Sequence, residues 1–213
     1  MATPGPHPAP ELPSRGADTR RTQILAAAAE LFARRGFHGT SIDELGAAVG
    51  TSGPAVYRHF PSKETILTTL LVDISRFLLA GGRRRMAGNT GWRAVDALID
   101  WQVSFALDNP TLIVVQNRDL DALPTVEERR VRRLQRAYVQ IWVDAIGSLG
   151  PGLDDRGALA ATHAVLGLIN STPHSARLER AAMAQLLHRM AQAAIAGTAT
   201  HAERSRTARS VRA

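Results

Sequence analysis

Residues 20–67 read RRTQILAAAAELFARRGFHGTSIDELGAAVGTSGPAVYRHFPSKETIL, and this stretch decides the fold. Its first part repeats apolar residues at helical spacing and predicts a helix over 19–35. Gly36 follows where a helix commonly ends in a left-handed residue. The rest of the stretch divides into further short helical segments, so it predicts a compact three-helix unit.

The next helix boundaries are also visible in the sequence. Ser41 and Glu44 fit the S-x-x-E capping box and predict the start of a second helix, which Gly50 ends. A third helix begins after Ser52. Pro54 lies in its first turn, where the missing N–H of a proline removes no helical hydrogen bond. Ser62 is a natural N-cap for a long fourth helix. The spacing is that of a helix-turn-helix, with the third helix as recognition helix.

A recognition helix presents short or polar side chains to the major groove while its other face packs in a small core. Val56 and Phe60 lie four residues apart and form the core face. Lys63, which is the only lysine of the chain, stands at the start of the fourth helix, where free backbone amides favour a phosphate. We predict DNA contacts from the polar or small residues that remain: Thr40, Ser41, Ser52, Gly53, Pro54, Ala55, Tyr57, Arg58, His59 and Lys63.

This segment closely resembles the TetR/AcrR family of bacterial transcriptional regulators. The resemblance is carried by A-x-x-L-F-x-x-x-G-F in the first helix, T-S-I-x-x-L across the second, and G-T-S-x-x-x-V-Y-R-H-F-P-S-K-E across the third. Two positions depart from the family pattern. Leu45-Gly46 replaces the usual Ile-Ala, and Pro54 lies inside the recognition helix.

The composition agrees with a polyanionic partner. The net charge is +7 and 45% of the residues are apolar, which is enough for a packed interior. With no cysteine, the chain has neither disulfides nor thiolate metal sites nor a cysteine nucleophile. No apolar signal core opens the chain, and no run reaches the roughly 18 apolar residues of a membrane helix, so we expect a cytoplasmic protein without membrane contact.

Nearly all of the remaining sequence predicts helices, so the fold class is all-α. Segment 81–91, with its glycines and three arginines, interrupts the pattern and is interpreted as a linker. We predict four parts: a disordered arm over 1–17, a helix-turn-helix domain over 18–65, a ligand-binding and dimerisation domain over 66–197, and a basic disordered tail over 198–213. The further helices are expected at 92–108, 110–119, 124–147, 155–171 and 177–196.

The resemblance implies that the larger domain binds a small molecule and forms a homodimer, with the fourth helix carrying the coupling. The last two predicted helices have apolar and small residues on facing sides, which suits a four-helix bundle between two copies. The alternative is that these faces complete the core of one copy. Paired half-sites on DNA favour the dimer.

For the ligand site we select aromatic and polar residues on otherwise apolar helices. Such residues line mainly apolar pockets with a few polar anchors, although each of them is also at home in a core. The predicted ligand-binding residues are Trp101, Phe105, Asn117, Tyr138, Trp142, His163 and Asn170. Segment 167–174 (GLINSTPH) resembles a helix-end motif of actinobacterial regulators of fatty-acid and sterol breakdown. That resemblance implies an acyl-CoA or another lipid-like effector, with Arg118, Arg132 or Arg136 holding its phosphates.

The function predicted from these features is a ligand-responsive, DNA-binding transcriptional regulator, most often a repressor in this family. A small hydrophobic effector would release it from a palindromic double-stranded DNA operator. One alternative is a dimeric DNA-binding regulator without an effector. A helical enzyme is the other, but the sequence has no H-E-x-x-H, no phosphate-cradling glycine loop and no paired histidine and carboxylate spacing. We therefore predict no catalytic residue, no metal site and no cofactor.

Overall fold

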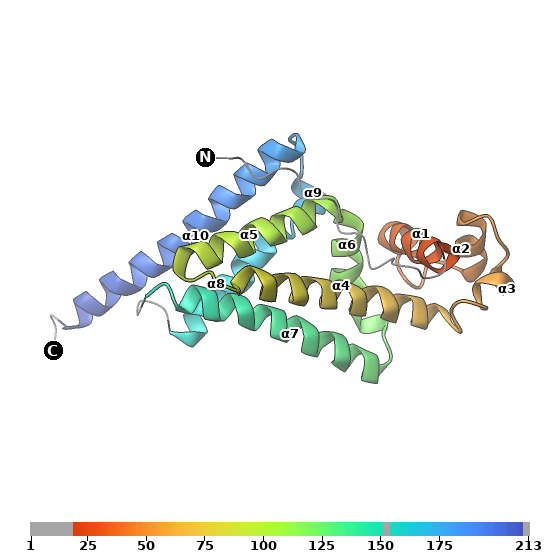
Figure 1. Cartoon of the computed structure of the whole chain (residues 1–213), viewed down its shortest axis with the longest axis horizontal. Helices are drawn as coiled ribbons and strands as arrows, with labels where there is room; N and C mark the ends of the chain where they lie inside the picture. Colours follow the sequence, from red (N-terminus) through yellow and green to blue (C-terminus); the bar gives the residue numbers. More distant parts are fainter. Residues whose placement is uncertain (1–18, 151–153, 211–213) are drawn as a thin grey trace. The chain divides into compact units, whose positions relative to one another are not determined.

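The computed structural model describes the backbone of residues 19–150 and 154–210, with the side chains of 20–150 and 154–198. Within these ranges the chain is helical and contains no strand (Figure 1). The predicted arm over 1–17 lies outside the described residues. The elements are α1 (Thr19–Arg35), α2 (Ile42–Ala48), α3 (Gly53–Val56), α4 (Lys63–Met86), α5 (Gly91–Asp108), α6 (Pro110–Arg118), the 3-10 helix η1 (Leu120–Ala122), α7 (Thr125–Gly147), α8 (Asp155–Ile169), α9 (Thr172–Ser175) and α10 (Arg180–Ser210).

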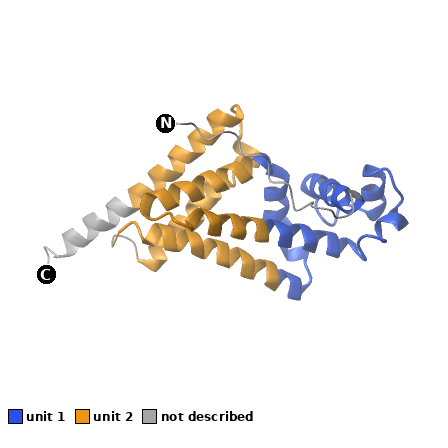
Figure 2. Cartoon of the chain, viewed as in Figure 1, with its two compact units in different colours: residues 1–74, 108–128 blue, residues 75–107, 129–213 orange. Residues whose placement is uncertain are grey.

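The chain forms two compact units (Figure 2). Unit 1 contains residues 1–74 and 108–128, and unit 2 contains 75–107 and 129–213. The division differs from the predicted boundary after residue 65, because α6 and η1 belong to unit 1 and pack beside α1. α4 begins in unit 1 and ends in unit 2.

Unit 1 has its own small core. α1 presents Ile24, Ala28 and Phe32 to it, and all three side chains are fully buried. α2 adds Leu45, α3 adds Val56, and the segment after α3 adds Phe60. α4 and α6 then close the core with further aliphatic side chains. These buried residues are Leu45, Val56, Phe60, Ile66, Leu67, Leu70, Leu112, Ile113 and Val115.

Unit 2 is a bundle of longer helices. α5 buries one whole apolar face, α7 contributes the fully buried Trp142, and α8 packs against α10. α10 continues to Ser210, past residue 198 where the sequence predicts a disordered tail. The side chains beyond residue 198 lie outside the described residues.

The predicted linker at 81–91 is wrong over its first half, because α4 continues to Met86. Gly81 and Gly82 are poor helix formers, but both are buried and leave room for aromatic neighbours, so packing overrides local propensity. In the described part of the chain, α4 is the one helix long and apolar enough to cross a membrane, although the sequence has no unbroken apolar run of that length. Since 61% of its apolar window is buried inside the protein, α4 is a core helix.

Candidate nucleic-acid interface and buried polar cluster

The turn after α1 is built around Gly36 and Phe37. Gly36 has φ +82°, which confirms the predicted left-handed residue at the end of the helix. Phe37 folds back against Phe32, with ring centroids 5.5 Å apart in an edge-to-face arrangement. Thr40 is 1% exposed, and its hydroxyl donates to the Gly36 carbonyl at 2.9 Å. The Thr40 side chain is therefore used inside the turn and is not presented for the predicted DNA contact.

The capping box at the start of α2 is confirmed. The Ser41 hydroxyl accepts from the Glu44 backbone N–H at 3.2 Å, and the Ser41 N–H donates to the Glu44 carboxylate at 2.8 Å. These bonds from Ser41, first the backbone N–H and then the hydroxyl, hold the pKa of Glu44 below its ordinary value. Arg35 at the end of α1 also pairs with Glu44. Ser41 remains exposed at this helix N-terminus.

α2 and α3 approach each other so closely that glycine is required at the contact. A Cβ on Gly46 would lie 2.8 Å from the Ser52 carbonyl carbon, which gives a physical reason for Gly46 where the family pattern has alanine. A Cβ on Gly53 would lie 1.9 Å from the Asp43 carboxylate. Gly53 and Ala55 are both buried, so neither presents a side chain to the outer side, where the predicted DNA contacts would lie. α3 spans only Gly53–Val56, and both residues lie on its inner side.

The outer side of the recognition segment holds the remaining predicted residues. Val56 and Phe60 are buried, as predicted for the core face. Ser52, Pro54 and Arg58 are exposed, and His59 is half-buried. Tyr57 is 53% exposed, a high value for an aromatic residue, and its ring is one of the few large apolar groups that the surface shows. These five residues form what we call the outer face: Ser52, Pro54, Tyr57, Arg58 and His59.

Lys63 has a role inside unit 1. Its Nζ donates to the carbonyl of Phe37 at 2.9 Å and to that of Thr40 at 2.7 Å. The same ammonium lies 4.5 Å from the centroid of the Phe37 ring. An ammonium has three N–H groups, so one donor remains for a partner outside the protein. Lys63 thus ties the start of α4 to the turn that follows α1.

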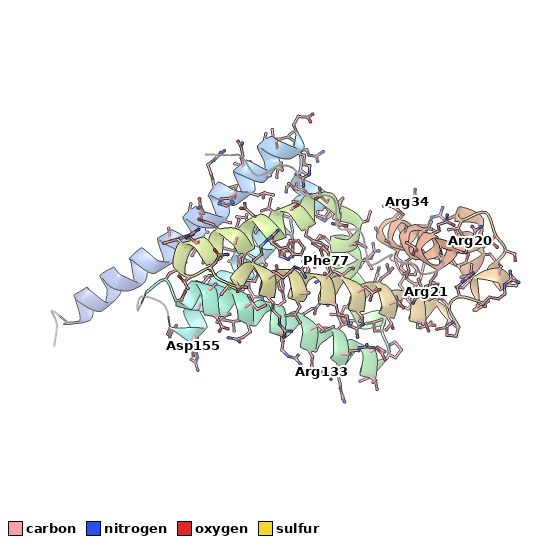
Figure 3. All side chains as sticks on the ribbon, viewed as in Figure 1. Arg20, Arg21, Arg34, Phe77, Arg133 and Asp155 are labelled. Atoms are coloured by element: carbon pink, nitrogen blue, oxygen red, sulfur yellow. The ribbon has the colours of Figure 1, made fainter. Side chains whose placement is uncertain are left out.

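Two arginines at the start of α1 also stay within the unit. Arg20 donates to the Val49 carbonyl at the end of α2. The Arg21 guanidinium lies 4.6 Å from the centroid of the Phe60 ring. Figure 3 labels both side chains beside α2 and α4, with Arg34 near the other end of α1. Arg20 therefore ties α1 to the end of α2, and Arg21 ties it to the recognition segment.

A contact that the sequence does not reveal joins α6 to the end of α1. The Arg118 guanidinium donates to the carbonyls of Phe32 and Ala33, the latter at 3.1 Å, and its Nε donates to Asp119 at 3.0 Å. Asp119 is 5% exposed and accepts from the Phe37 N–H at 3.4 Å. The Asp119 carboxylate raises the pKa of Arg118. Arg118 therefore caps α1, and its predicted role at effector phosphates is not supported.

In unit 2, three of the selected aromatic and polar residues meet two neighbours that sequence reasoning missed. The Trp101 ring lies 4.8 Å from that of Phe77, which in turn lies 6.0 Å from that of Phe105, between centroids. The Tyr138 hydroxyl donates to Gln102 Oε1 at 2.8 Å. We call Phe77, Trp101 and Phe105 the aromatic group. Gln102 follows Trp101 directly, so its hydrogen bond with Tyr138 lies beside this group on α5.

The hydrogen bonds of Gln102 continue to α8. Gln102 is 1% exposed, and its Nε2 donates to the Asn170 side-chain oxygen at 2.8 Å. Trp142 is fully buried, and its ring lies edge-to-face with that of Tyr138 at 6.5 Å between centroids. Burial raises the pKa of Tyr138 strongly, while the nearby Trp142 N–H opposes part of the rise. We call Gln102, Tyr138, Trp142 and Asn170 the polar cluster.

Two predicted ligand residues lie outside this group. Asn117 is exposed on α6 and belongs to unit 1. His163 is exposed on α8. Since neither side chain is enclosed with the others, the structure does not bring all seven predicted ligand residues together. His163 and Asn170 differ in burial: His163 is exposed, while Asn170, the C-cap of α8, bonds to Gln102.

α4 contacts both groups through adjacent glycines. A Cβ on Gly81 would lie 2.1 Å from the Trp101 ring, and a Cβ on Gly82 would lie 2.8 Å from the Tyr138 ring. The Trp101 indole N–H donates to the Leu78 carbonyl of the same helix at 3.3 Å. The second half of α4 is thus in direct contact with the aromatic group and the polar cluster.

Comparison with known proteins gives consistent results. Residues 24–70 match the profile described as bacterial regulatory proteins, tetR family. The chain is 30% identical over 156 residues to the transcriptional repressor KstR2 of Mycolicibacterium smegmatis, covering 68% of this chain and 75% of that protein. It is 36% identical over 89 residues to the transcriptional activator FasR of the same species, covering 39% of this chain and less than half, 41%, of that protein.

Solved structures share the fold along most of the chain. A TetR-family regulator from Bordetella parapertussis superimposes with a TM-score of 0.76 at 25% identity, covering 82% of this chain and 95% of that one. AibR, solved with isovaleryl coenzyme A and operator DNA, superimposes with a TM-score of 0.69 at 18% identity, covering 80% and 97%.

Proposed function

The chain belongs to the TetR family of bacterial regulatory proteins, and we propose on this basis that it is a dimeric repressor which a small hydrophobic effector releases from a palindromic DNA operator. The observation that carries the proposal is the outer face, where Tyr57 and Arg58 are exposed while Val56 and Phe60 are buried. A recognition helix requires this division. Small residues at its front, Ser52 and Pro54, permit a close approach to base edges.

Phosphate contacts are assigned to donors that flank the outer face. Tyr57 and His59 offer donors to the backbone, and Lys63 has one N–H left after its two internal bonds. Ser41 lies at the N-terminus of α2, where an anion is stabilised. Arg58 is assigned to a phosphate or a guanine edge. Thr40, Gly53 and Ala55 have no direct role in this assignment.

A dimer is proposed because one helix-turn-helix reads only half of a palindrome. Unit 2 leaves large apolar side chains exposed on or beside α8 and α10. Leu159 is 42% exposed, Met190 is 46% exposed and Leu178 is 54% exposed. A two-fold contact through these helices would bury them as a four-helix bundle.

The effector is assigned to unit 2, beside the aromatic group and the polar cluster. Support comes from the mainly apolar surroundings with a few polar groups, which suit a small hydrophobic molecule. Descriptions of fold relatives point in the same direction. AibR was solved with isovaleryl coenzyme A, and the KstR2 of Mycobacterium tuberculosis, whose structure shares this fold, is described as a ketosteroid transcriptional regulator. The residues proposed to contact it are Trp101, Phe105, Tyr138, Trp142 and Asn170.

Release requires only a small difference in affinity between two states. The contact of Gly81 and Gly82 with Trp101 and Tyr138 places α4 against the proposed ligand residues, and the same helix begins beside the turn that Lys63 closes. If the effector favours a state with a different half-site spacing, tenfold weaker DNA binding needs about 1.4 kcal/mol.

The test is a fluorescence-anisotropy titration with duplex DNA from upstream of the protein's own gene, beside a scrambled duplex at fixed salt. We expect selective binding that saturates at two chains per site. Affinity should fall by about 10³ to 10⁵ between 50 and 200 mM salt if six to ten phosphates are contacted. Equal and weak binding to both duplexes, repeated with fragments from neighbouring promoters, would contradict the proposal.

A further inference from the structure

Gly46 lies at the centre of the turn between α2 and α3. Its carbonyl accepts from the Val49 N–H at 3.1 Å and from the Thr51 N–H at 2.8 Å. Gly50, which stands between these two donors, has φ +67°, the left-handed conformation that glycine adopts readily in tight turns. The turn of the helix-turn-helix is therefore folded onto the backbone of one α2 residue.

The start of the recognition segment rests directly on Gly46. A Cβ at this residue would lie 2.8 Å from the Ser52 carbonyl carbon, 2.9 Å from the Gly53 nitrogen and 3.0 Å from the Ser52 oxygen. These three atoms belong to one peptide group, which cannot rotate away as the end of a side chain can. A side chain at residue 46 would therefore push the Ser52–Gly53 peptide group away from α2.

Helix propensity gives no reason for a glycine at this position. Gly46 is buried inside α2, and glycine in a helix interior is less favourable than alanine, the residue of the usual family pattern. Alanine would strengthen α2 by itself. What glycine permits is the close approach of the next helix. In this chain the recognition segment therefore lies closer to α2 than an alanine at residue 46 would allow.

The peptide group on Gly46 also sets the front of the outer face. Ser52 and Pro54 are exposed there, while Gly53 between them is buried, so a displacement of the peptide group moves both exposed side chains together. A hydrogen bond weakens steeply as its distance and angle depart from the optimum, whereas attraction between charges falls off slowly with distance. Base reading should therefore depend on this contact more than phosphate binding does.

We propose that Gly46 is a specificity-determining residue, which sets the depth at which the outer face meets the base edges. It acts by position: the Ser52–Gly53 peptide group rests on its Cα, and Ser52 and Pro54 follow the place of that peptide group. Its role rests on the proposed function, in which the outer face reads an operator. Because base contacts discriminate between sequences and phosphate contacts do not, Gly46 governs selectivity rather than general affinity for DNA.

The first experiment measures sequence preference with no operator known beforehand. A library of duplexes with about 24 randomised base pairs, long enough for two half-sites one helical turn apart, is selected with the full chain. Anisotropy then gives the Kd for the most enriched duplex and for a scrambled one, with the unaltered chain and with Gly46→Ala. We expect Gly46→Ala to lower the ratio of the two affinities at least about tenfold, and to change the affinity for the scrambled duplex by less than about twofold.

A second variant disturbs the same turn without adding a side chain to residue 46. Gly50→Ala places an alanine at φ +67°, and its Cβ meets nothing within 4 Å, so the strain is confined to the backbone of the turn. We expect the affinity ratio to fall at least about threefold, because the donors on both sides of Gly50 hold the turn to the Gly46 carbonyl. If Gly46→Ala shows no thermal unfolding transition, Gly50→Ala decides alone.

Each variant has a matched control in unit 2. Gly147→Ala adds a Cβ at the end of α7 that meets nothing within 4 Å, and Gly88→Ala places an alanine at φ +76° in equally open space. Both controls should keep the affinity ratio of the unaltered chain. The contrast separates a change at the α2–α3 contact from the general effect of replacing a glycine.

The outcomes separate the role of Gly46 from the proposed function. A Gly46→Ala chain that keeps the unaltered ratio would overturn the specificity role, and so would equal weakening on both duplexes, which is the mark of a merely structural residue. Where Gly50→Ala decides, a ratio equal to that of Gly88→Ala has the same meaning. An unaltered chain that enriches no sequence would refute the proposed function and the role of Gly46 with it.

Discussion

Tyr57 exposes a large aromatic ring that contributes little to the core of unit 1. Its ring is 53% exposed, and it follows Val56, which is fully buried. An aromatic side chain with a hydroxyl at its tip suits a surface that becomes half-buried against another molecule. In the proposed function that molecule is DNA, and the hydroxyl donates to a phosphate.

Tyr57→Phe should therefore weaken operator binding and leave the fold unchanged. The lost bond is one to a charged acceptor, worth about 1.5–3 kcal/mol, so we expect at least a tenfold higher Kd. Anisotropy measures the affinity, and sedimentation checks that the oligomeric state is retained. An affinity equal to that of the unaltered protein would remove Tyr57 from the interface.

Lys63 combines two roles, and its substitution should affect both. Lys63→Ala removes the donors to the Phe37 and Thr40 carbonyls, and we expect a loss of about 1–3 kcal/mol in the free energy of unfolding along with weaker DNA binding. Chemical denaturation and anisotropy measure the two effects. A loss of affinity at unchanged stability would contradict the internal role, and Lys63→Arg serves as the charge-retaining control.

At the scale of the helix, caps formed by neighbouring residues can be predicted from the sequence, and caps supplied by distant residues cannot. Gly36 and the Ser41–Glu44 box were predicted because each motif is contained within four residues. Arg118 could not be predicted as the cap of α1, because its acceptor carbonyls lie 85 and 86 residues earlier in the chain. The burial of Thr40 could not be predicted for a related reason, since Lys63 of α4 donates to the Thr40 carbonyl and holds this turn.

The glycine pair in α4 was misread as a linker, and its substitution tests the packing explanation. Gly81→Ala should destabilise the protein by about 1–3 kcal/mol, because the added Cβ would meet the Trp101 ring. Gly197→Ala is the matched helical control. Nothing lies within 4 Å of its added Cβ, so it should stabilise α10 by about 0.5–1 kcal/mol. Thermal unfolding of both variants decides the matter; equal stabilisation by the two would refute the close contact.

At the scale of the whole molecule, the exposed apolar residues of unit 2 predict the oligomeric state. Met190→Glu places a charge among side chains that a dimer would bury, and it should shift the protein to single chains. Operator affinity should fall with it, because each chain then holds only one half-site. Sedimentation measures the oligomeric state, and anisotropy measures the operator affinity. Glu substitution at Val126, which is 73% exposed on α7, is the control. A Met190→Glu protein that remains dimeric would contradict the proposed face.

Unit 1 is discontinuous in sequence, because residues 108–128 complete it after a long excursion through unit 2. Arg118 and Asp119, which finish the end of α1, are encoded well downstream of the helix-turn-helix. A gene fusion that ends after α4 would transfer the helix-turn-helix without these two side chains. Recombination between relatives is therefore expected to keep unit 1 intact only when residues 1–74 and 108–128 are exchanged together.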